Sequence, residues 1–317
     1  MPSSTARPGQ GHFIAPLEET PLQAVDAVDT EGKPRTTWGD AWDSMRRRPM
    51  FWISSALIVV IVFVALFPNL FTAESPTAGC LLANSNGAPE AGHPFGFTRQ
   101  GCDVFARVLY GAQASLMVGV LATLMVTIFG GIVGALAGYY GGVLDAIVSR
   151  IGDIFFAIPI ILGAIVLMSA IPQRTPVLVA LVIALFAWPQ IARIMRGAVL
   201  TARQSDYVIA STALGLSKFR ILARHVLPNA IGPVIAVATV SLGTYIVAES
   251  TLSFLGIGLP PSTMSWGNDI SQARTSLTTN PMVMVYPAAA LSLTVLSFLM
   301  LGDVLRDALD PKERARR

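Results

Sequence analysis

Six apolar runs without a charged residue dominate the sequence. They cover residues 51–71, 108–144, 154–173, 175–192, 226–248 and 275–302. A membrane-spanning helix needs about 20 residues to cross the ~30 Å hydrocarbon core of a bilayer, and each run supplies close to that length or more. The chain lacks the alternation over ~10 residues that marks the strands of a membrane β-barrel. The pattern therefore predicts an all-α membrane protein with six transmembrane helices.

The composition excludes an ordinary soluble domain. Of the 317 residues, 53% are hydrophobic and only 13% are charged, whereas soluble domains carry about 25% charged residues. The surface of the folded chain must therefore be largely apolar, as expected for a protein that faces lipid.

The positive charges predict the orientation in the membrane. If the N-terminus is cytoplasmic, the external loops contain only four of the 22 Lys and Arg residues. These four are Arg99, Arg107, Arg174 and Arg274. The reverse orientation would break the rule that cytoplasmic loops carry the excess of Lys and Arg. Both termini should therefore be cytoplasmic, and the net charge of +3 reflects topology rather than nucleic-acid binding.

The N-terminal region divides into two parts. Residues 1–36 mix Pro, Glu, Asp and Thr without the apolar core of a signal peptide, which predicts a disordered cytoplasmic tail. In residues 37–49, Trp38, Trp42 and Met45 recur at helical spacing beside three arginines. This pattern favours an interfacial helix on the inner leaflet, and a cytosolic extension of the first span is the alternative. At the other end, residues 312–317 are expected to form a short cytoplasmic tail.

Both cysteines of the chain fall in the first external loop. An oxidising compartment favours a disulfide between Cys80 and Cys102, and two free thiols are the alternative. Closing a loop of this size would stabilise the folded state by about 3 kcal/mol. A metal site would need more ligands than His93, so we expect a structural bond.

Small residues mark one face of the second run. Four glycines recur at every fourth position, namely Gly130, Gly134, Gly138 and Gly142. Such spacing allows a second helix backbone to approach closely. Static packing is the simpler interpretation, and a sliding contact in a moving transporter is the alternative. Prolines within the spans predict kinks at three positions, because each frees a backbone carbonyl: Pro159, Pro189 and Pro287.

Glu249 is the most unusual ionisable residue at membrane depth. It has no cation nearby in sequence, so it must face the protein interior or a water-filled path. Two roles stay open for Glu249 with its neighbours Ser250 and Ser253. They line a translocation pathway, or they form an internally hydrogen-bonded structural group.

Two pairs of opposite charges lie near the cytoplasmic ends of spans. Arg150 and Asp153 are three residues apart, as are Asp303 and Arg306. Residues at this spacing share a helix face, so each pair is expected to interact. Anchoring at the membrane interface is the simpler role for them, ahead of proton transfer.

The sequence contains no motif for catalysis. A phosphate-binding loop of the GxxxxGK[ST] type is missing, so the chain should not bind or hydrolyse ATP by itself. His12, His93 and His225 lie outside the apolar runs, and no Ser–His–Asp or HExxH arrangement has useful spacing. We therefore expect a protein that is not an enzyme and has no metal or cofactor of its own.

A polar segment at residues 200–228 interrupts the apolar pattern. Its stretch "IASTALGLSKFRILARHVLP" resembles the EAA signature of permease subunits of ABC importers. Ala210 fills the first alanine position, Gly215 fills the glycine position, and Leu227 with Pro228 forms the ending. Three positions depart from the signature, with Ile209 in place of its acidic residue. The other two are Ser211 and His225.

Three further stretches narrow the resemblance to the C-type permeases of dipeptide, oligopeptide and nickel importers. They are "HPFGFTRQGCDVFARVLYGAQASLMVG", "ESTLSFLGIGLPPSTMSWG" and "LGDVLRDALDP". Together the resemblance covers about residues 38–311. It implies the six-helix type I importer fold over residues 50–311, with external loops at 72–112 and 256–281.

The resemblance implies that the polar segment is a cytoplasmic coupling helix that docks on an ATPase subunit. Binding of its basic residues to anionic lipid is the alternative. The residues implied to make the ATPase contact are Tyr207, Ala210, Ser211, Leu214, Gly215, Leu216, Ser217 and Arg220.

The resemblance also implies the partners. They are a homologous permease, two ATP-binding subunits that carry ATP and Mg²⁺, and an extracytoplasmic substrate-binding protein, all at a bacterial inner membrane. Trp266 in the second external loop is a candidate anchor for the binding protein, because aromatic residues are enriched at interfaces. A position in the aromatic belt of the membrane is the alternative.

The expected cargo is a dipeptide or oligopeptide, with glutathione-like peptides and nickel chelates as alternatives within the family. An ion-coupled transporter or channel that uses Asp153, Glu249 and Asp303 as a relay is an alternative of a different class. A membrane scaffold without transport activity is the third possibility.

Overall fold

A computed structural model of the protein describes residues 37–309, and the predicted tails at 1–36 and 312–317 lie outside this range. Apart from two isolated β-bridges in the loop before α3, the described residues form helices and loops. The helices in chain order are α1 (Thr37–Met45), α2 (Pro49–Leu66), η1 (Pro68–Leu70), η2 (Leu82–Asn84), α3 (Val104–Tyr140), α4 (Gly142–Ala157), α5 (Ile160–Ser169), α6 (Pro176–Arg203), α7 (Asp206–Ala213), α8 (Lys218–Ile221), η3 (Leu222–Val226), α9 (Leu227–Phe254), α10 (Trp266–Ala273), η4 (Arg274–Ser276) and α11 (Met282–Leu309).

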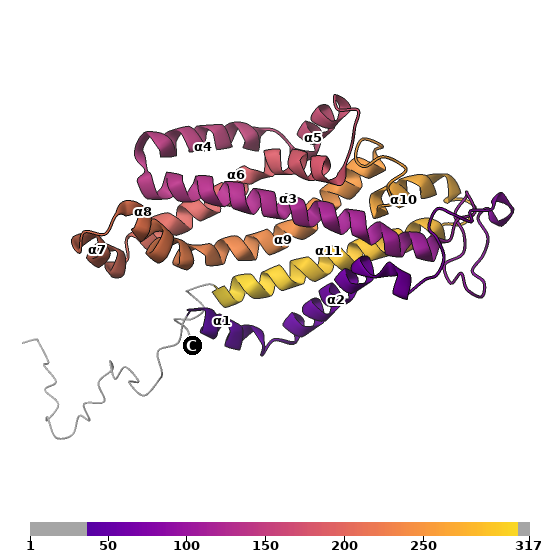
Figure 1. The fold of residues 1–317 in the computed structure, drawn as a ribbon, viewed down its shortest axis with the longest axis horizontal. Coiled ribbons are helices and arrows are strands. Elements are labelled where there is room, and N and C mark those ends of the chain that lie inside the picture. The colour runs from indigo at the N-terminus through magenta and orange to yellow at the C-terminus, as the bar shows by residue number, and fades with distance from the viewer. Residues whose placement is uncertain (1–36, 310–317) are drawn as a thin grey trace, which may run out of the picture.

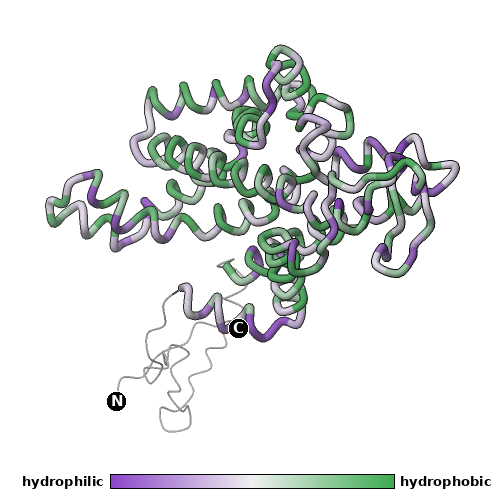
Figure 2. The backbone as a smooth tube through the Cα atoms, turned by 45° about the vertical axis from the view of Figure 1, so that its right-hand side comes forward, coloured by the Kyte–Doolittle hydropathy of each residue, from purple (hydrophilic) through white to green (hydrophobic). Residues whose placement is uncertain are grey.

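The long helices run side by side along one axis of the molecule (Figure 1). Within the described residues, five helices are long and apolar enough to cross a membrane, and the number is six if the bent pair α4 and α5 is one span. α7 and α8 project from one end of this bundle, while α10 and the loop before α3 lie at the other end (Figure 1). The tube coloured by hydropathy is mostly hydrophobic along the long helices (Figure 2). This agrees with the predicted all-α membrane fold.

Glycines bring α3 and α6 into direct backbone contact. A Cβ atom added at Gly134 would lie 2.2 Å from the carbonyl oxygen of Ala192. A Cβ atom at Gly130 would lie 2.6 Å from the oxygen of Trp188, and one at Gly138 would lie 2.8 Å from that of Arg196. Three of the four glycines predicted to pack helices therefore lie against α6.

The fourth glycine of the series has a different role. Gly142 begins α4 with a φ of +61°, and a Cβ atom there would meet nothing within 4 Å. Gly141 before it has a φ of +66° and ends α3. Two successive residues in this region of φ need glycine, because other residues adopt it only with strain. The predicted second span therefore ends at Tyr140, earlier than expected.

The third predicted span is broken. α4 and α5 meet at an angle of 82°, at Ile158 with extended backbone and at Pro159. Proline lacks the N–H that continues a helix and disfavours a helical residue before it, so the predicted kink is a full break. α6 and α11, by contrast, continue through Pro189 and Pro287.

Several helices extend past the charged residues at which the sequence predicted their ends. α6 runs to Arg203, and α9 continues beyond Ala248 to Phe254. Ion pairs between helices stabilise such charges at the bundle surface. The Arg196 guanidinium binds both carboxylate oxygens of Asp145 on α4. Runs without charged residues thus locate the spans in the sequence but do not give the residues at which the helices end.

α9 lies at the centre of the bundle. Its buried residues Val234, Tyr245 and Leu252 join the main apolar core, which also contains side chains of α3, α5 and α6. On the other side α9 packs on α11, where Gly302 fits against Val240. This position places α9 in contact with nearly every long helix.

The helix predicted in residues 37–49 is present as α1, and one face of it packs against α11. Ala41 and Met45 are buried with Val304 and Ala308 of α11. Trp38 and Trp42 are exposed on the same helix. The predicted stripe of Trp38, Trp42 and Met45 is therefore divided, because Met45 faces the protein.

We expect Gly134→Ala to destabilise the fold more than Gly131→Ala. The added Cβ at position 134 meets the backbone oxygen of Ala192, whereas at position 131 its nearest neighbour is the flexible Met195 side chain at 3.8 Å. Overpacking of this kind costs about 1–3 kcal/mol, and both variants gain the same helix propensity from alanine. Thermal denaturation of the purified protein in detergent measures the difference. Equal melting temperatures would contradict the α3–α6 contact.

Candidate functional site

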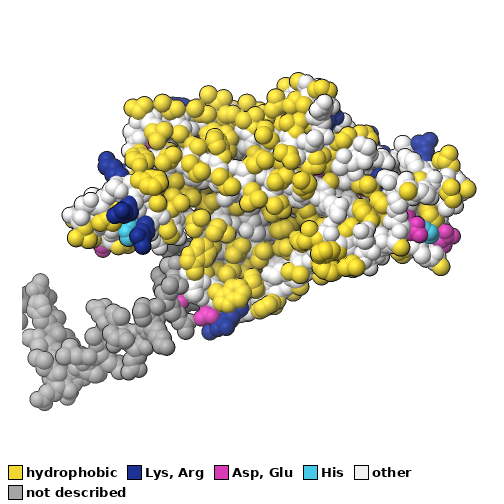
Figure 3. All heavy atoms as spheres, viewed as in Figure 1, with side chains coloured by type: hydrophobic (Ala, Val, Ile, Leu, Met, Phe, Trp, Pro, Cys, Tyr) yellow, Lys and Arg dark blue, Asp and Glu magenta, His cyan; other side chains and the backbone are white. Residues whose placement is uncertain are grey.

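A short helical protrusion at one end of the bundle carries the predicted coupling segment. Val208, Ile221 and Leu222 are buried and attach α7, α8 and η3 to the long helices. The outer surface combines basic and apolar side chains, and Lys and Arg gather at this end in the space-filling view (Figure 3). Leu214 is 80% exposed and Phe219 is 70% exposed. An exposed apolar surface beside basic groups is typical of a protein-binding site.

The eight residues predicted to contact an ATPase subunit all lie on this protrusion. Ser211 and Leu216 are half-buried. The other six are exposed, namely Tyr207, Ala210, Leu214, Gly215, Ser217 and Arg220. One small surface therefore presents all of them.

Gly215 forms the turn between α7 and α8. Its φ is +79°, and a Cβ atom there would meet nothing within 4 Å. The N–H of Gly215 donates to the oxygen of Thr212 (3.0 Å), and the N–H of Leu216 donates to that of Ser211 (3.3 Å). These bonds close the end of α7, as a glycine in this conformation commonly does at helix C-termini. Glycine is required here by the positive φ of the backbone, because a side chain at this position would not collide with any neighbour within the chain.

A groove of ≈ 550 Å³ lies at the base of the protrusion. It is lined by Tyr139 and Tyr140 at the end of α3, by Arg203 at the end of α6, and by Ile209 and Lys218. Ile209, which stands where the signature has an acidic residue, is 59% exposed. With Ile209 in place of an acidic residue, the groove is lined by this apolar side chain together with the basic residues Arg203 and Lys218.

Glu249 is a buried structural group in this conformation. Its side chain is fully buried near the C-terminal end of α9. The carboxylate accepts hydrogen bonds from the hydroxyls of Ser253 (2.8 Å), Ser115 on α3 (3.0 Å) and Ser250 (3.2 Å). Of the two roles left open for Glu249, Ser250 and Ser253, the structure shows the internally hydrogen-bonded one.

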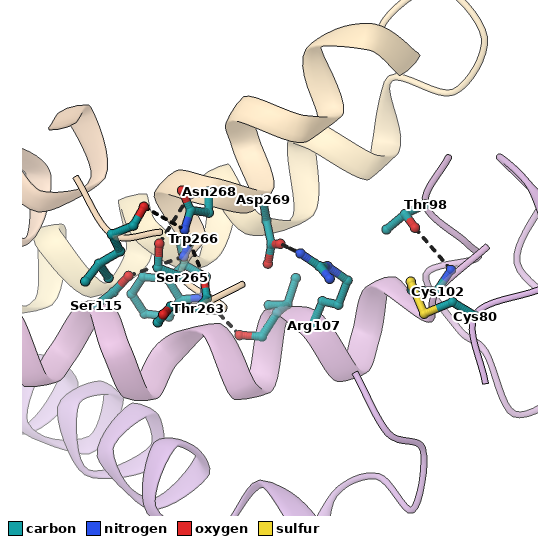
Figure 4. Close-up of polar contacts among 12 residues, drawn as sticks. Cys80, Thr98, Cys102, Arg107, Ser115, Thr263, Ser265, Trp266, Asn268 and Asp269 are labelled. Carbon is teal, nitrogen blue, oxygen red and sulfur yellow. Dashed lines mark hydrogen bonds and ion pairs between the residues drawn. A yellow bond between two sulfur atoms is a disulfide. The ribbon is translucent and has the colours of Figure 1, made fainter. Parts of the chain in front are cut away.

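Trp266 begins α10 and is only 2% exposed. Its indole N–H donates to the oxygen of Val108 on α3 (2.9 Å), and Figure 4 shows the ring between α3 and α10. Both predicted roles for Trp266 need an exposed ring, so the structure contradicts a docking anchor and a membrane-belt residue alike. Gly111 leaves the room for the ring, because a Cβ there would lie 3.3 Å from it.

An ion pair between α3 and α10 was not predicted from the sequence. The Nε and Nη2 atoms of Arg107 both bind one carboxylate oxygen of Asp269 (Figure 4). Burial raises the pKa of Asp269 to about 6, while the Arg107 guanidinium opposes the rise. The ion pair with Arg107 therefore favours the ionised form of the carboxylate against its burial. The two residues are 162 positions apart, so no local pattern could reveal the pair.

The loop before α3 is closed by the disulfide between Cys80 and Cys102 (Figure 4). The N–H of Cys102 donates to the Thr98 hydroxyl (3.1 Å), and Asp103 accepts from the N–H of Ala106 at the start of α3. The bond therefore fixes the loop directly at the beginning of α3.

Comparison with known proteins identifies the family. Residues 130–315 match the family described as binding-protein-dependent transport system inner membrane component. The chain is a permease of this ABC importer family. Residues 36–89 also match the N-terminal TM domain of oligopeptide transport permease C.

Curated relatives match this permease over nearly its full length. The glutathione transport system permease protein GsiD from Escherichia coli O6:K15:H31 (strain 536) is 37% identical over 298 residues. The GsiD protein of Shigella sonnei has the same identity. In both comparisons the match covers 94% of this chain and 96% of the relative.

The carboxylates of the ion-coupled alternative do not form a buried relay in the permease. Asp153 on α4 and Asp303 on α11 are exposed, and only Glu249 is buried. Asp153 binds Arg193 on α6 (3.2 Å) rather than the predicted Arg150. Because the chain belongs to the ABC importer family, we reject both the ion-coupled transporter or channel and the structural scaffold.

The other predicted charge pair does not form among the described residues. Asp307, and not Asp303, forms the ion pair at the end of α11, where it binds Arg48 before α2 (2.5 Å). Within residues 37–309 no ion pair joins Asp303 to Arg306. Pairing between helices therefore prevailed over pairing within one helix for Asp153 alone.

We expect Asp269→Ala to destabilise the permease by about 3–5 kcal/mol, because it leaves the buried Arg107 without a counter-charge. Asp269→Asn should cost less, since its amide oxygen can still accept from Arg107. Asp303→Ala, at an exposed position on α11, is the matched control and should change little. Thermal denaturation in detergent tests the order of the three variants, and a loss as large for Asp303→Ala would contradict the prediction.

Proposed function

We propose that the permease forms half of the path of an ATP-driven importer and that its α7–α8 protrusion couples this path to an ATPase subunit. The observation that carries the proposal is the exposed surface of Tyr207, Leu214 and Phe219 at a basic end of the bundle. Lipid does not account for it, because a lipid-facing helix needs no Gly215 turn and no separate protrusion. A groove on a protein partner would bury these side chains.

The positions of the elements support a cytoplasmic location of this end. α1, the C-terminal end of α11 and the protrusion lie toward the same end of the bundle, and the disulfide-closed loop lies at the opposite end (Figure 1). The arginines 46–48 and Arg220 belong to the first end, in agreement with the positive-inside rule. Both termini are then cytoplasmic in a bacterial inner membrane.

The proposed assembly contains this permease, a homologous permease, two ATP-binding subunits and an extracytoplasmic binding protein. ATP and Mg²⁺ belong to the ATP-binding subunits, and this chain supplies no catalytic group. Closure of the ATP-binding subunits would move the two protrusions together and reorient the transmembrane halves.

The proposed cargo is a short peptide, with glutathione as the first member to examine. The support is the 37% identity to permeases named for glutathione transport and the match of residues 36–89 to an oligopeptide permease domain. In this proposal the binding protein selects the peptide.

Uptake by cells that contain the complete importer tests cargo and energy source. Labelled glutathione or a dipeptide should accumulate saturably, and accumulation should stop when a partner ATPase is inactivated. Competition with unlabelled peptides and with a nickel chelate then ranks the cargo. Accumulation that continues without ATPase activity and depends on a proton gradient would refute the proposed coupling.

We expect Gly215→Val to reduce transport and ATPase binding at least tenfold without affecting membrane insertion. A β-branched residue is strained at a φ of +79° by about 1–2 kcal/mol or more, so the turn between α7 and α8 would change its course. Gly215→Asn is the matched control, because asparagine tolerates this conformation. Co-purification of the ATPase subunit and uptake measure the effect. Equal defects in both variants would indicate a side-chain clash with the partner instead of a backbone requirement.

A further inference from the structure

The Glu249 carboxylate lies at the centre of two hydrogen-bond relays at the outer end of the bundle. It accepts from the hydroxyls of Ser115 and Ser253. Each of these hydroxyl oxygens in turn accepts a backbone N–H from the external segment 256–276. Ser115 accepts from Trp266 (3.3 Å), and Ser253 accepts from Leu259 (3.1 Å).

Two serine hydroxyls connect Glu249 to the external segment. Each hydroxyl donates its single proton to a carboxyl oxygen of Glu249 and keeps its lone pairs for the backbone N–H. One buried group on α9 thereby binds two separate points of the external segment, Leu259 before α10 and Trp266 at its start. We call this group, consisting of Glu249, Ser115 and Ser253, the outer clasp.

The backbone of the external segment lies directly on α9 at the outer clasp. A Cβ atom at Gly267 would lie 2.6 Å from the Cα atom of Ser250, and one at Gly258 would lie 2.4 Å from the nitrogen of Ser253. Asn268 closes the segment on itself, because its amide donates to the oxygens of Pro260 (2.9 Å) and Thr263 (2.8 Å). The segment is therefore a compact unit attached to α9, not a free loop.

The same helix reaches the cytoplasmic protrusion. α8, η3 and α9 form one helical stretch of 37 residues from Lys218 to Phe254, which corresponds to about 55 Å at 1.5 Å per residue. Its first turn follows the Gly215 turn, and its last turns carry Glu249 and Ser253. The π-helical turn η3 lies between them and the protrusion, and such turns are common at functional sites.

We propose that Glu249 is a positioning residue that fixes the external segment to α9, so that docking of the binding protein on this segment reaches the coupling protrusion through α9. The exposed side of the segment, with Pro261, Ser262 and Thr275, receives the binding protein. Trp266, Asn268 and Asp269 face inward and hold the segment. This inference rests on the proposed function, in which α7 meets the ATPase.

The test uses the complete importer in lipid nanodiscs with its peptide-loaded binding protein. Glu249→Ala should leave ATP hydrolysis without binding protein within about twofold of the wild type. The stimulation of hydrolysis by loaded binding protein should fall at least fivefold. Amide hydrogen exchange at Leu259 and Trp266 should accelerate in the same variant. Glu249→Gln, which keeps one accepting oxygen, should lie between wild type and Glu249→Ala.

Two controls separate positioning from general loss of structure. Glu74→Ala changes an exposed carboxylate in the other external loop and should leave the stimulation unchanged. The double variant Ser115→Ala with Ser253→Ala removes both relays with a smaller change of volume, and it decides the matter if Glu249→Ala fails to assemble. It should lose stimulation to the same extent.

The outcomes distinguish this inference from the proposed function. A wild-type complex that is not stimulated by its binding protein would overturn the proposed function itself. If the wild type is stimulated and the Glu249 and serine variants are stimulated equally, the clasp has no part in transmission. Lower melting temperatures with an unchanged stimulation factor would also overturn the proposal, since they indicate a purely structural role.

Discussion

The backbone contact between α3 and α6 is the constraint on which the other elements depend. In lipid, helices gain little from burying apolar side chains, so close packing must supply the attraction between them. Gly130, Gly134 and Gly138 allow it, because a side chain at any of them would collide with the α6 backbone. α3 carries Arg107 and Ser115 in its N-terminal part, and α6 continues almost directly into α7. The contact therefore fixes both functional ends of the permease relative to each other.

The two ends of the bundle differ in whether their polar and apolar side chains have partners within the chain. At the end opposite the protrusion, polar groups are buried and mostly paired within the chain, as in the Glu249 and Asp269 contacts. At the other end, Leu214 and Phe219 are apolar and exposed. A buried polar network specifies one arrangement of its elements, whereas an exposed apolar surface is stabilised by a partner. The end opposite the protrusion therefore has most of its buried polar groups paired within the chain, whereas the protrusion keeps large apolar side chains exposed.

The sequence predicted the elements that depend on local patterns. Runs without charged residues located the spans, the cysteine positions indicated the disulfide, and the EAA-like stretch indicated the protrusion. The sequence-based predictions failed where a contact joins residues far apart in the chain, or where a residue on another helix competes for the same partner. Asp153 was assigned to Arg150 on its own helix but binds Arg193 on α6. Trp266 was expected at the surface, yet Gly111 of α3, 155 positions earlier, provides the space that buries it.

Glu249 shows why a costly residue at membrane depth does not by itself indicate a pathway. The penalty for burying a carboxylate is offset only by several hydrogen bonds, and three hydroxyls supply them here. Ser250 and Ser253 follow Glu249 by one and four positions, but Ser115 comes from α3, so the local sequence indicated only part of the group. The backbone N–H groups of Leu259 and Trp266, which donate to Ser253 and Ser115, both belong to the segment 256–276 that packs on α9. A single acidic side chain near the C-terminal end of α9 therefore organises the end of the molecule opposite the protrusion.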